Sequence, residues 1–101
     1  MIKHVVLFKL ASFAEGNSKH ENALYLKDKL EALENLIPEL LKVEVVLNMA
    51  NVSADNYDLM LITEFASLED LDTYIKHPEH VKVGSFLSKV RTDRAAIDFQ
   101  F

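Results

Sequence analysis

The chain has 101 residues, of which 50% are hydrophobic and 27% are charged, a composition typical of one globular domain covering residues 1–101. Its net charge of −5 at pH 7 argues against nucleic-acid binding, which usually needs a basic face. It has no cysteine, which excludes disulfides and thiol catalysis, and no apolar run of the ~20 residues that cross a membrane. We therefore expect a soluble cytoplasmic protein without a nucleic-acid or membrane partner.

The first half of the chain predicts a strand, a helix and a second strand. Residues 2–10 alternate between two faces and are rich in β-branched and aromatic residues, as a strand requires. The segment 18–21 reads Ser-Lys-His-Glu, a capping box that starts a helix, and Pro38 ends that helix. Residues 42–49 alternate again and predict a strand. The solvent face of the helix is expected to carry Lys27, Asp28, Glu31 and Glu34.

The second half of the chain predicts a strand, a helix in two segments and a last strand. Residues 51–56 are rich in turn formers, so residues 57–65 are expected to return as an antiparallel strand. Ser67 caps a helix that breaks at His77-Pro78, where a second helical segment begins. Residues 94–101 predict the last strand. The order β-α-β-β-α-β predicts an α+β protein with a ferredoxin-like fold and an antiparallel sheet.

In this fold the helices cover one face of the sheet, and the other face is open. The covered face is expected to hold the richer apolar set: Ile2, Val6, Phe8, Val43, Val45, Leu47, Leu59, Leu61, Ile97 and Phe99. The open face is expected to carry Val5, Leu7, Val46, Met60, Ile62 and Ala96, inside a rim of Lys3, Lys9, Glu44, Asp58, Glu64 and Asp98. Soluble monomers rarely expose so much apolar surface. We predict a homodimer with two sheets packed face to face; a monomer with a partly apolar surface is the alternative.

Three side chains are candidates for chemistry: His4, Tyr74 and His80. Their places in the apolar patterns direct all three into the space between the sheet and the last helical segment. Two interpretations are open. They are packed core residues that satisfy one another's hydrogen bonds. Alternatively, they line a pocket where a neutral histidine acts as a general base and the tyrosine stabilises an oxyanion.

The remaining histidines and charged residues offer a metal site or surface ion pairs. His77 and His80 flank a carboxylate, but a zinc site needs a third or fourth ligand, and only His4 is available from elsewhere. We expect no metal and no cofactor. Lys89, Arg91, Asp93 and Arg94 precede the last strand and are expected to form surface ion pairs of little energetic value.

Three segments resemble the stress-responsive A/B barrel (Dabb) family: residues 2–9, 74–81 and 92–94. The resemblance covers essentially the whole chain and implies a dimeric α+β barrel. The family includes plant stress proteins, uncharacterised bacterial proteins and cyclases that fold polyketides by aldol chemistry. In those cyclases a histidine matching His80 is taken as the base that removes a carbon-bound proton, and residues matching Tyr74 and His4 hold substrate carbonyls. One departure from the more polar cyclases is the apolar inner face of the first helix, Ala23, Leu26, Leu30 and Leu33.

Three hypotheses about function follow. The first is a homodimer with lyase- or cyclase-like acid–base chemistry on a small hydrophobic ligand, using His80 as base and His4 and Tyr74 as carbonyl partners. The second is a non-catalytic, stress-associated dimer for binding or assembly, with a tightly filled space beneath the helices. The third, by analogy of architecture alone, is a cofactor-independent or haem-handling monooxygenase.

Overall fold

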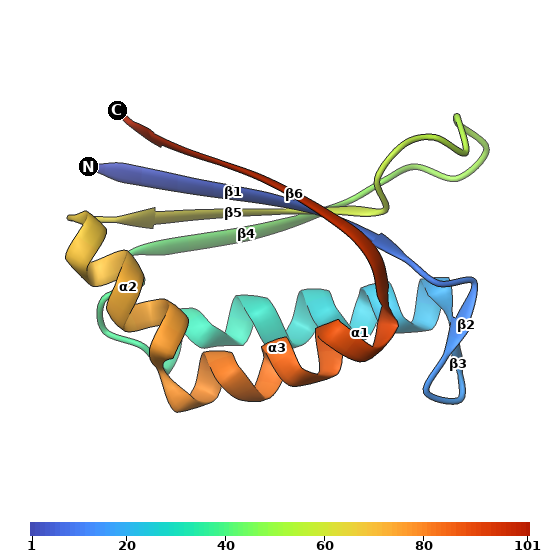
Figure 1. Cartoon of the computed structure of the whole chain (residues 1–101), viewed down its shortest axis with the longest axis horizontal. Coiled ribbons are helices and arrows are strands. Elements are labelled where there is room, and N and C mark those ends of the chain that lie inside the picture. The colour runs from blue at the N-terminus through green and yellow to red at the C-terminus, as the bar shows by residue number, and fades with distance from the viewer.

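The computed structural model describes residues 1–101, which form an antiparallel four-stranded sheet with three helices on one face (Figure 1). The strands are β1 (Ile2–Leu10), β4 (Lys42–Leu47), β5 (Leu59–Phe65) and β6 (Arg91–Gln100), in the spatial order β4-β5-β1-β6. The helices are α1 (Lys19–Ala32), α2 (Leu68–Lys76) and α3 (Pro78–Val90), with a 3₁₀ turn η1 (Leu33–Asn35) after α1. This arrangement confirms the predicted ferredoxin-like α+β fold. None of the helices is long and apolar enough to span a membrane.

The start of α1 follows the predicted capping box. The Ser18 hydroxyl accepts a hydrogen bond from the Glu21 N–H at 3.2 Å, and the Ser18 N–H donates to the Glu21 carboxylate at 3.0 Å. The preceding segment forms a small hairpin from β2 (Phe13–Ala14) and β3 (Asn17–Ser18). Its turn residues Glu15 and Gly16 both have positive φ, 51° and 79°, as in the type I′ turns that join paired strands tightly.

The predicted break at His77 is confirmed and sets the position of α3. His77 has φ −62° and ψ 136°, an extended conformation that the following Pro78 favours. Its Nδ1 accepts a hydrogen bond from the Glu79 N–H at 3.1 Å, so the imidazole caps the new helix. Because α3 therefore begins beside the end of α2, His80 in its first turn lies close to Tyr74.

Along β1 the predicted alternation is confirmed, because alternate residues from Ile2 to Leu10 are buried beneath the helices. The last strand differs from the expectation. In β6, Ile97 pairs with Val5 and Phe99 with Lys3, so both lie on the open face, where they are 65% and 44% exposed. Ala96 pairs with Val6 and lies on the helix side instead. The prediction took the more apolar side of each strand as the covered one.

Asp98 also departs from its predicted place on the rim of the open face. It pairs with His4 across the ladder between β1 and β6, and its side chain lies on the helix side of the sheet. The reason is the same register, because directly opposed residues in an antiparallel pair share a face. Every residue of β6 except Ala95 is exposed, so polar side chains on the helix side of this edge strand remain in contact with water.

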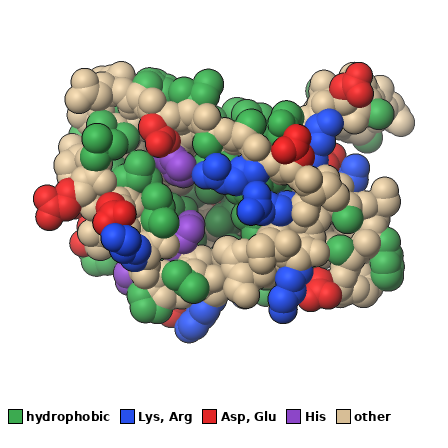
Figure 2. All heavy atoms as spheres, in the orientation of Figure 1, with side chains coloured by type: hydrophobic (Ala, Val, Ile, Leu, Met, Phe, Trp, Pro, Cys, Tyr) green, Lys and Arg blue, Asp and Glu red, His purple; other side chains and the backbone are tan.

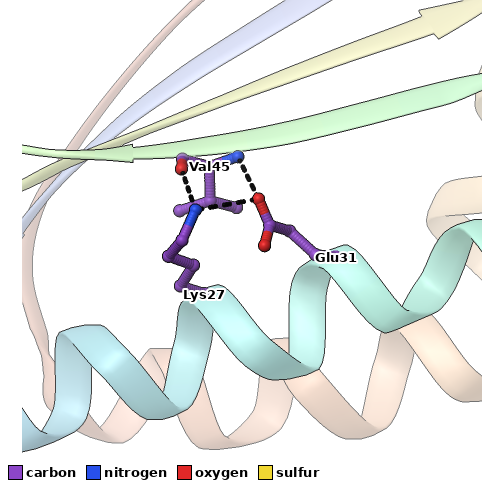
Figure 3. A network of polar contacts seen from close by, with 3 residues as sticks. All are labelled: Lys27, Glu31 and Val45. Atoms are coloured by element: carbon purple, nitrogen blue, oxygen red, sulfur yellow. Dashed lines mark hydrogen bonds and ion pairs between the residues drawn. The ribbon is translucent and has the colours of Figure 1, made fainter.

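The face of α1 predicted to be solvated has a structural role at the opposite edge of the sheet (Figure 3). Lys27 donates to the Val45 carbonyl at 2.7 Å, and the Val45 N–H donates to the Glu31 carboxylate at 3.1 Å. Glu34 accepts the Val43 N–H at 3.1 Å in the same way. These side chains satisfy backbone groups of the edge strand β4, which would otherwise be available for pairing with another chain.

Candidate functional site

A pocket of about 240 Å³ lies between the sheet and α3. Apolar residues from β1, β5, α1 and α3 form its floor, and none of its lining residues is acidic. Figure 2 shows the same feature as a hollow with hydrophobic side chains inside and histidine and Lys or Arg side chains around it. The polar side chains that line it are His4, His80, Arg91 and Arg94.

His80 is positioned by the break between α2 and α3. Its Nδ1 lies 3.0 Å from the Ile75 carbonyl oxygen, which can only accept a hydrogen bond, so Nδ1 carries the proton. In the neutral ring the lone pair is therefore on Nε2, which has no partner within the chain. Burial lowers the pKa of His80 below its ordinary value of 6.5, outweighing the opposing Ile75 bond, and the charges of His4 and His77 lower it further. His80 is thus a neutral base at pH 7.

His4 lies in the centre of β1 and is 7% exposed. On one side, its Nδ1 is paired with the Asp98 carboxylate of β6. On the other side, the Thr63 hydroxyl of β5 donates to the His4 backbone carbonyl at 2.8 Å. The carboxylate fixes the orientation of the imidazole and holds a proton on Nδ1, which leaves Nε2 for interactions in the pocket.

Tyr74 does not line the pocket. Its side chain is fully buried, and its ring centroid lies 4.5 Å from that of His80 and 5.0 Å from that of Phe65. The hydroxyl is buried without a hydrogen-bond partner, and burial raises the pKa of Tyr74 well above its ordinary value. The structure therefore brings His4 and His80 together in one pocket and places Tyr74 behind His80, where its ring supports the imidazole.

Three residues of the site were missed as candidates: Arg91 and Arg94, which line the pocket, and Asp98, which pairs with the pocket residue His4. The charge pattern predicts surface ion pairs for the two arginines, and the alternation of the last strand predicts Asp98 on the rim of the open face. Asp98 can be identified from its pairing opposite His4, but only if the face of β6 that points to the helices is assigned correctly. The two arginines lie on the same face because of a β-bulge in β6, which the sequence pattern does not reveal.

One family model matches nearly the whole chain. The model for the Stress Responsive A/B Barrel Domain, Dabb, covers residues 2–101. The chain belongs to the Dabb family.

Two similar proteins are a curated plant relative and a bacterial protein of known structure. The Dabb chain is 29% identical over 107 residues to the stress-response A/B barrel domain-containing protein DABB1 of Arabidopsis thaliana, covering 98% of the chain but 46% of that relative. It thus spans about half the length of this curated relative. A dimeric protein of unknown function and ferredoxin-like fold from Bacteroides fragilis is 34% identical, with a TM-score of 0.78 and coverage of 99% and 95% of the two chains.

A second similar structure is that of a lyase. The hydroxynitrile lyase of Passiflora edulis has a TM-score of 0.78 at 13% identity, with 97% of this Dabb chain and 90% of the lyase covered. At that identity the likeness concerns the fold alone.

The Dabb pocket does not contain a set of metal ligands. No three His, Asp or Glu side chains gather where they could hold an ion. His77, which the sequence analysis considered as a ligand, uses its Nδ1 to cap α3. The groups that the pocket offers to a ligand are therefore imidazole and guanidinium nitrogens above an apolar floor.

Proposed function

We propose that this Dabb chain works as a homodimer that binds a small hydrophobic molecule in the His4–His80 pocket and removes a carbon-bound proton from it. The observation that carries the proposal is the arrangement of His80. Its Nδ1–H is fixed by the Ile75 carbonyl, its ring lines the pocket, and burial lowers its pKa, so Nε2 is available as a base at neutral pH.

The chemistry fits a carbon acid next to a carbonyl group. The C–H bond breaks, its proton passes to His80 Nε2, and its electron pair forms an enolate. His4, when protonated, has a free Nε2–H that donates to the enolate oxygen, while Asp98 holds the other nitrogen. Tyr74 is a positioning residue in this scheme, acting through the contact of its ring with His80.

A glycine in α3 favours a pocket over a tightly filled core. Gly84 lies in the middle of the helix and lines the pocket, and a Cβ built on it would meet no atom within 4 Å. Glycine inside a helix costs roughly 0.5–1 kcal/mol relative to alanine. A core selected for packing alone would gain from a side chain at this position, whereas a ligand needs the space. This observation speaks against the tightly filled space that the non-catalytic alternative expects beneath the helices.

The proposed dimer rests on the open face of the sheet. Apolar side chains from all four strands lie there: Val5, Leu7, Val46, Met60, Ile62, Ala95, Ile97 and Phe99. The corrected position of Ile97 and Phe99 enlarges this patch beyond the one predicted from sequence. Burial of such a face against a second copy is the usual way to remove it from water. The 34% identical Bacteroides fragilis protein is described as dimeric.

The dimer is tested by placing a charge on the patch. We expect Ile97→Lys to shift the protein from dimer to monomer in sedimentation-velocity experiments, because a lysine ammonium would be buried without a partner. Leu24→Lys is the matched control, since Leu24 is 48% exposed on α1, away from the open face. A wild-type monomer at micromolar concentration would overturn the proposal for the dimer.

The base is tested by hydrogen–deuterium exchange. Neutral methyl ketones of four to seven carbons are incubated with the protein in D₂O, and loss of the α-proton signals is followed by NMR. We expect His80→Gln to slow the protein-catalysed exchange by about 10²-fold or more, and His20→Gln, on the exposed side of α1, to leave it unchanged. Exchange that persists in a folded His80→Gln variant would overturn the assignment. No acceleration by the wild type would favour the non-catalytic alternative.

A further inference from the structure

We infer that the ligand of this pocket carries a carboxylate, held at the pocket's rim by Arg91 and Arg94. The inference rests on the proposed pocket and adds the chemical class of its ligand. These two residues are the chain's only arginines, and both line the same pocket from the start of β6.

A β-bulge brings the two side chains to one face. Residues three apart in a regular strand point to opposite sides of the sheet. In β6, Asp93 pairs with Lys9 and Arg91 with Leu10, so Thr92 is an extra residue and the register shifts there. Arg91 and Arg94 consequently both lie on the helix side, opposite the buried residues Leu10 and Phe8. Bulges often redirect side chains next to functional sites.

The backbone that carries the arginines is held in place. β6 follows α3 without a loop, and the Arg91 N–H donates to the Leu87 carbonyl as the C-cap of the helix. On the other side of this junction, the Ala11 N–H donates to the Val90 carbonyl at 2.9 Å. The backbone at the start of β6 is thus tied to both α3 and the end of β1, which fixes the positions from which the two arginine side chains extend.

Neither arginine has an acidic partner in the chain. Six lysines pair with carboxylates, namely Lys3, Lys19, Lys27, Lys76, Lys82 and Lys89. The nearest acidic residues of β6 are engaged elsewhere: Asp93 accepts from the Tyr57 hydroxyl at 3.1 Å, and Asp98 pairs with His4. In a chain of net charge −5, this leaves a pocket with two unpaired guanidinium groups and no acidic lining residue.

This combination suits an organic acid. A guanidinium group presents a planar pair of donors that matches the two oxygens of a carboxylate. The apolar floor, which includes Phe8 and Leu87, requires a hydrophobic body that an inorganic anion lacks. The volume of about 240 Å³ is below that of pockets for drug-sized molecules, so the acid is small. With its carboxylate at the arginines, the rest of the molecule is directed along the floor toward His80 and His4.

The test compares a carboxylate with its neutral isostere. Hexanoate, hexanamide and inorganic phosphate are titrated into ¹⁵N-labelled protein, and affinities are taken from backbone amide shifts of residues around the pocket. We expect hexanoate to bind about tenfold or more tightly than hexanamide, and inorganic phosphate to bind more weakly than hexanoate. Arg91→Gln and Arg94→Gln should each weaken hexanoate binding about tenfold or more and leave hexanamide binding unchanged. Lys42→Gln, which removes one exposed positive charge on the far strand β4, should change neither.

Several results would overturn the inference. These are equal affinities for hexanoate and hexanamide, unchanged hexanoate binding in the folded Arg91→Gln/Arg94→Gln double variant, or phosphate binding as tight as hexanoate. Because binding is read without turnover, the two proposals fail separately. A His80→Gln variant that retains both ketone exchange and selective hexanoate binding refutes only the base. A wild type that exchanges ketone protons but does not distinguish hexanoate from hexanamide refutes only the carboxylate.

Discussion

The Tyr74 hydroxyl gives the sharpest test of how the site is built. The sequence and the family resemblance assign this oxygen to a substrate carbonyl, whereas the structure buries it outside the pocket without a hydrogen-bond partner. The substitution Tyr74→Phe removes only this oxygen and keeps the ring that contacts Phe65 and His80. We therefore expect Tyr74→Phe to stabilise the fold and to leave ligand binding and proton exchange unchanged.

The magnitude follows from two opposing effects. A buried polar group without a partner costs about 1–3 kcal/mol of folding free energy, which the substitution recovers. The void left by one oxygen is smaller than a methyl-sized cavity, which costs ~1 kcal/mol. The net expectation is a gain of about 1 kcal/mol in the free energy of unfolding. For a domain of this length, that gain raises Tm by roughly 4–8 °C.

Thermal and urea unfolding followed by circular dichroism measure this change, with all variants at one protomer concentration because dimerisation would shift Tm. Tyr57→Phe is the matched control, since the Tyr57 hydroxyl donates to Asp93 and its loss should lower stability slightly. A Tyr74→Phe variant that is less stable than the wild type would show that the hydroxyl has a partner. A variant that folds normally but loses proton exchange would refute the positioning role and restore direct contact with the substrate.

Three further changes test other parts of the structure. Gly84→Ala should raise the free energy of unfolding by about 0.5–1 kcal/mol in thermal melts and weaken hexanoate binding, because the new Cβ enters the pocket. Glu31→Ala should lower stability in urea by about 1–2 kcal/mol, because the Val45 N–H loses a carboxylate acceptor, whereas Asp28→Ala should have little effect. Burial of Glu31 favours the neutral acid, but the hydrogen bonds to its carboxylate outweigh burial and lower its pKa below 4.5. The contribution of Glu31 to the free energy of unfolding is therefore present above pH 4.5 and is lost as the pH falls through the lowered pKa. Burial also lowers the pKa of His80 below 6.5, so the acid limb of the pH–rate profile for exchange should lie below pH 6.5, and a limb above that pH would contradict the assignment.

The parts of the fold that depend on local chemistry were predictable from sequence. The Ser18–Glu21 capping box and the His77-Pro78 break both define helix starts through contacts within a few residues, and both are confirmed. The alternation in β1 also identified His4 as an inward-facing residue, because one side of that strand is uniformly apolar apart from the histidine. These features predict that His4 and His80 lie on opposite walls of one space.

The parts that depend on register between distant strands were not predictable. Whether Asp98 or Ile97 faces the helices is decided by a pairing with residues more than ninety positions earlier in the chain. Hydrophobicity gave the wrong answer because the open face of β6 is the more apolar one. A one-residue change of phase exchanges the two faces of a strand, so this single error displaced Ile97, Phe99, Ala96 and Asp98 together.

The two faces of β6 connect the proposed dimer with the proposed site. One face presents Ile97 and Phe99 to the open side of the sheet, and the other presents Arg94 to the pocket and Asp98 to His4. The strand is at the edge of the sheet and is exposed on nearly all its residues, so within one protomer it is secured mainly by its ladder with β1. A partner packed on the open face would contact and restrain β6, the strand that holds Asp98 beside His4. Covering the apolar patch would therefore also limit the motion of Arg94, which lines the pocket, and of Asp98, which pairs with His4.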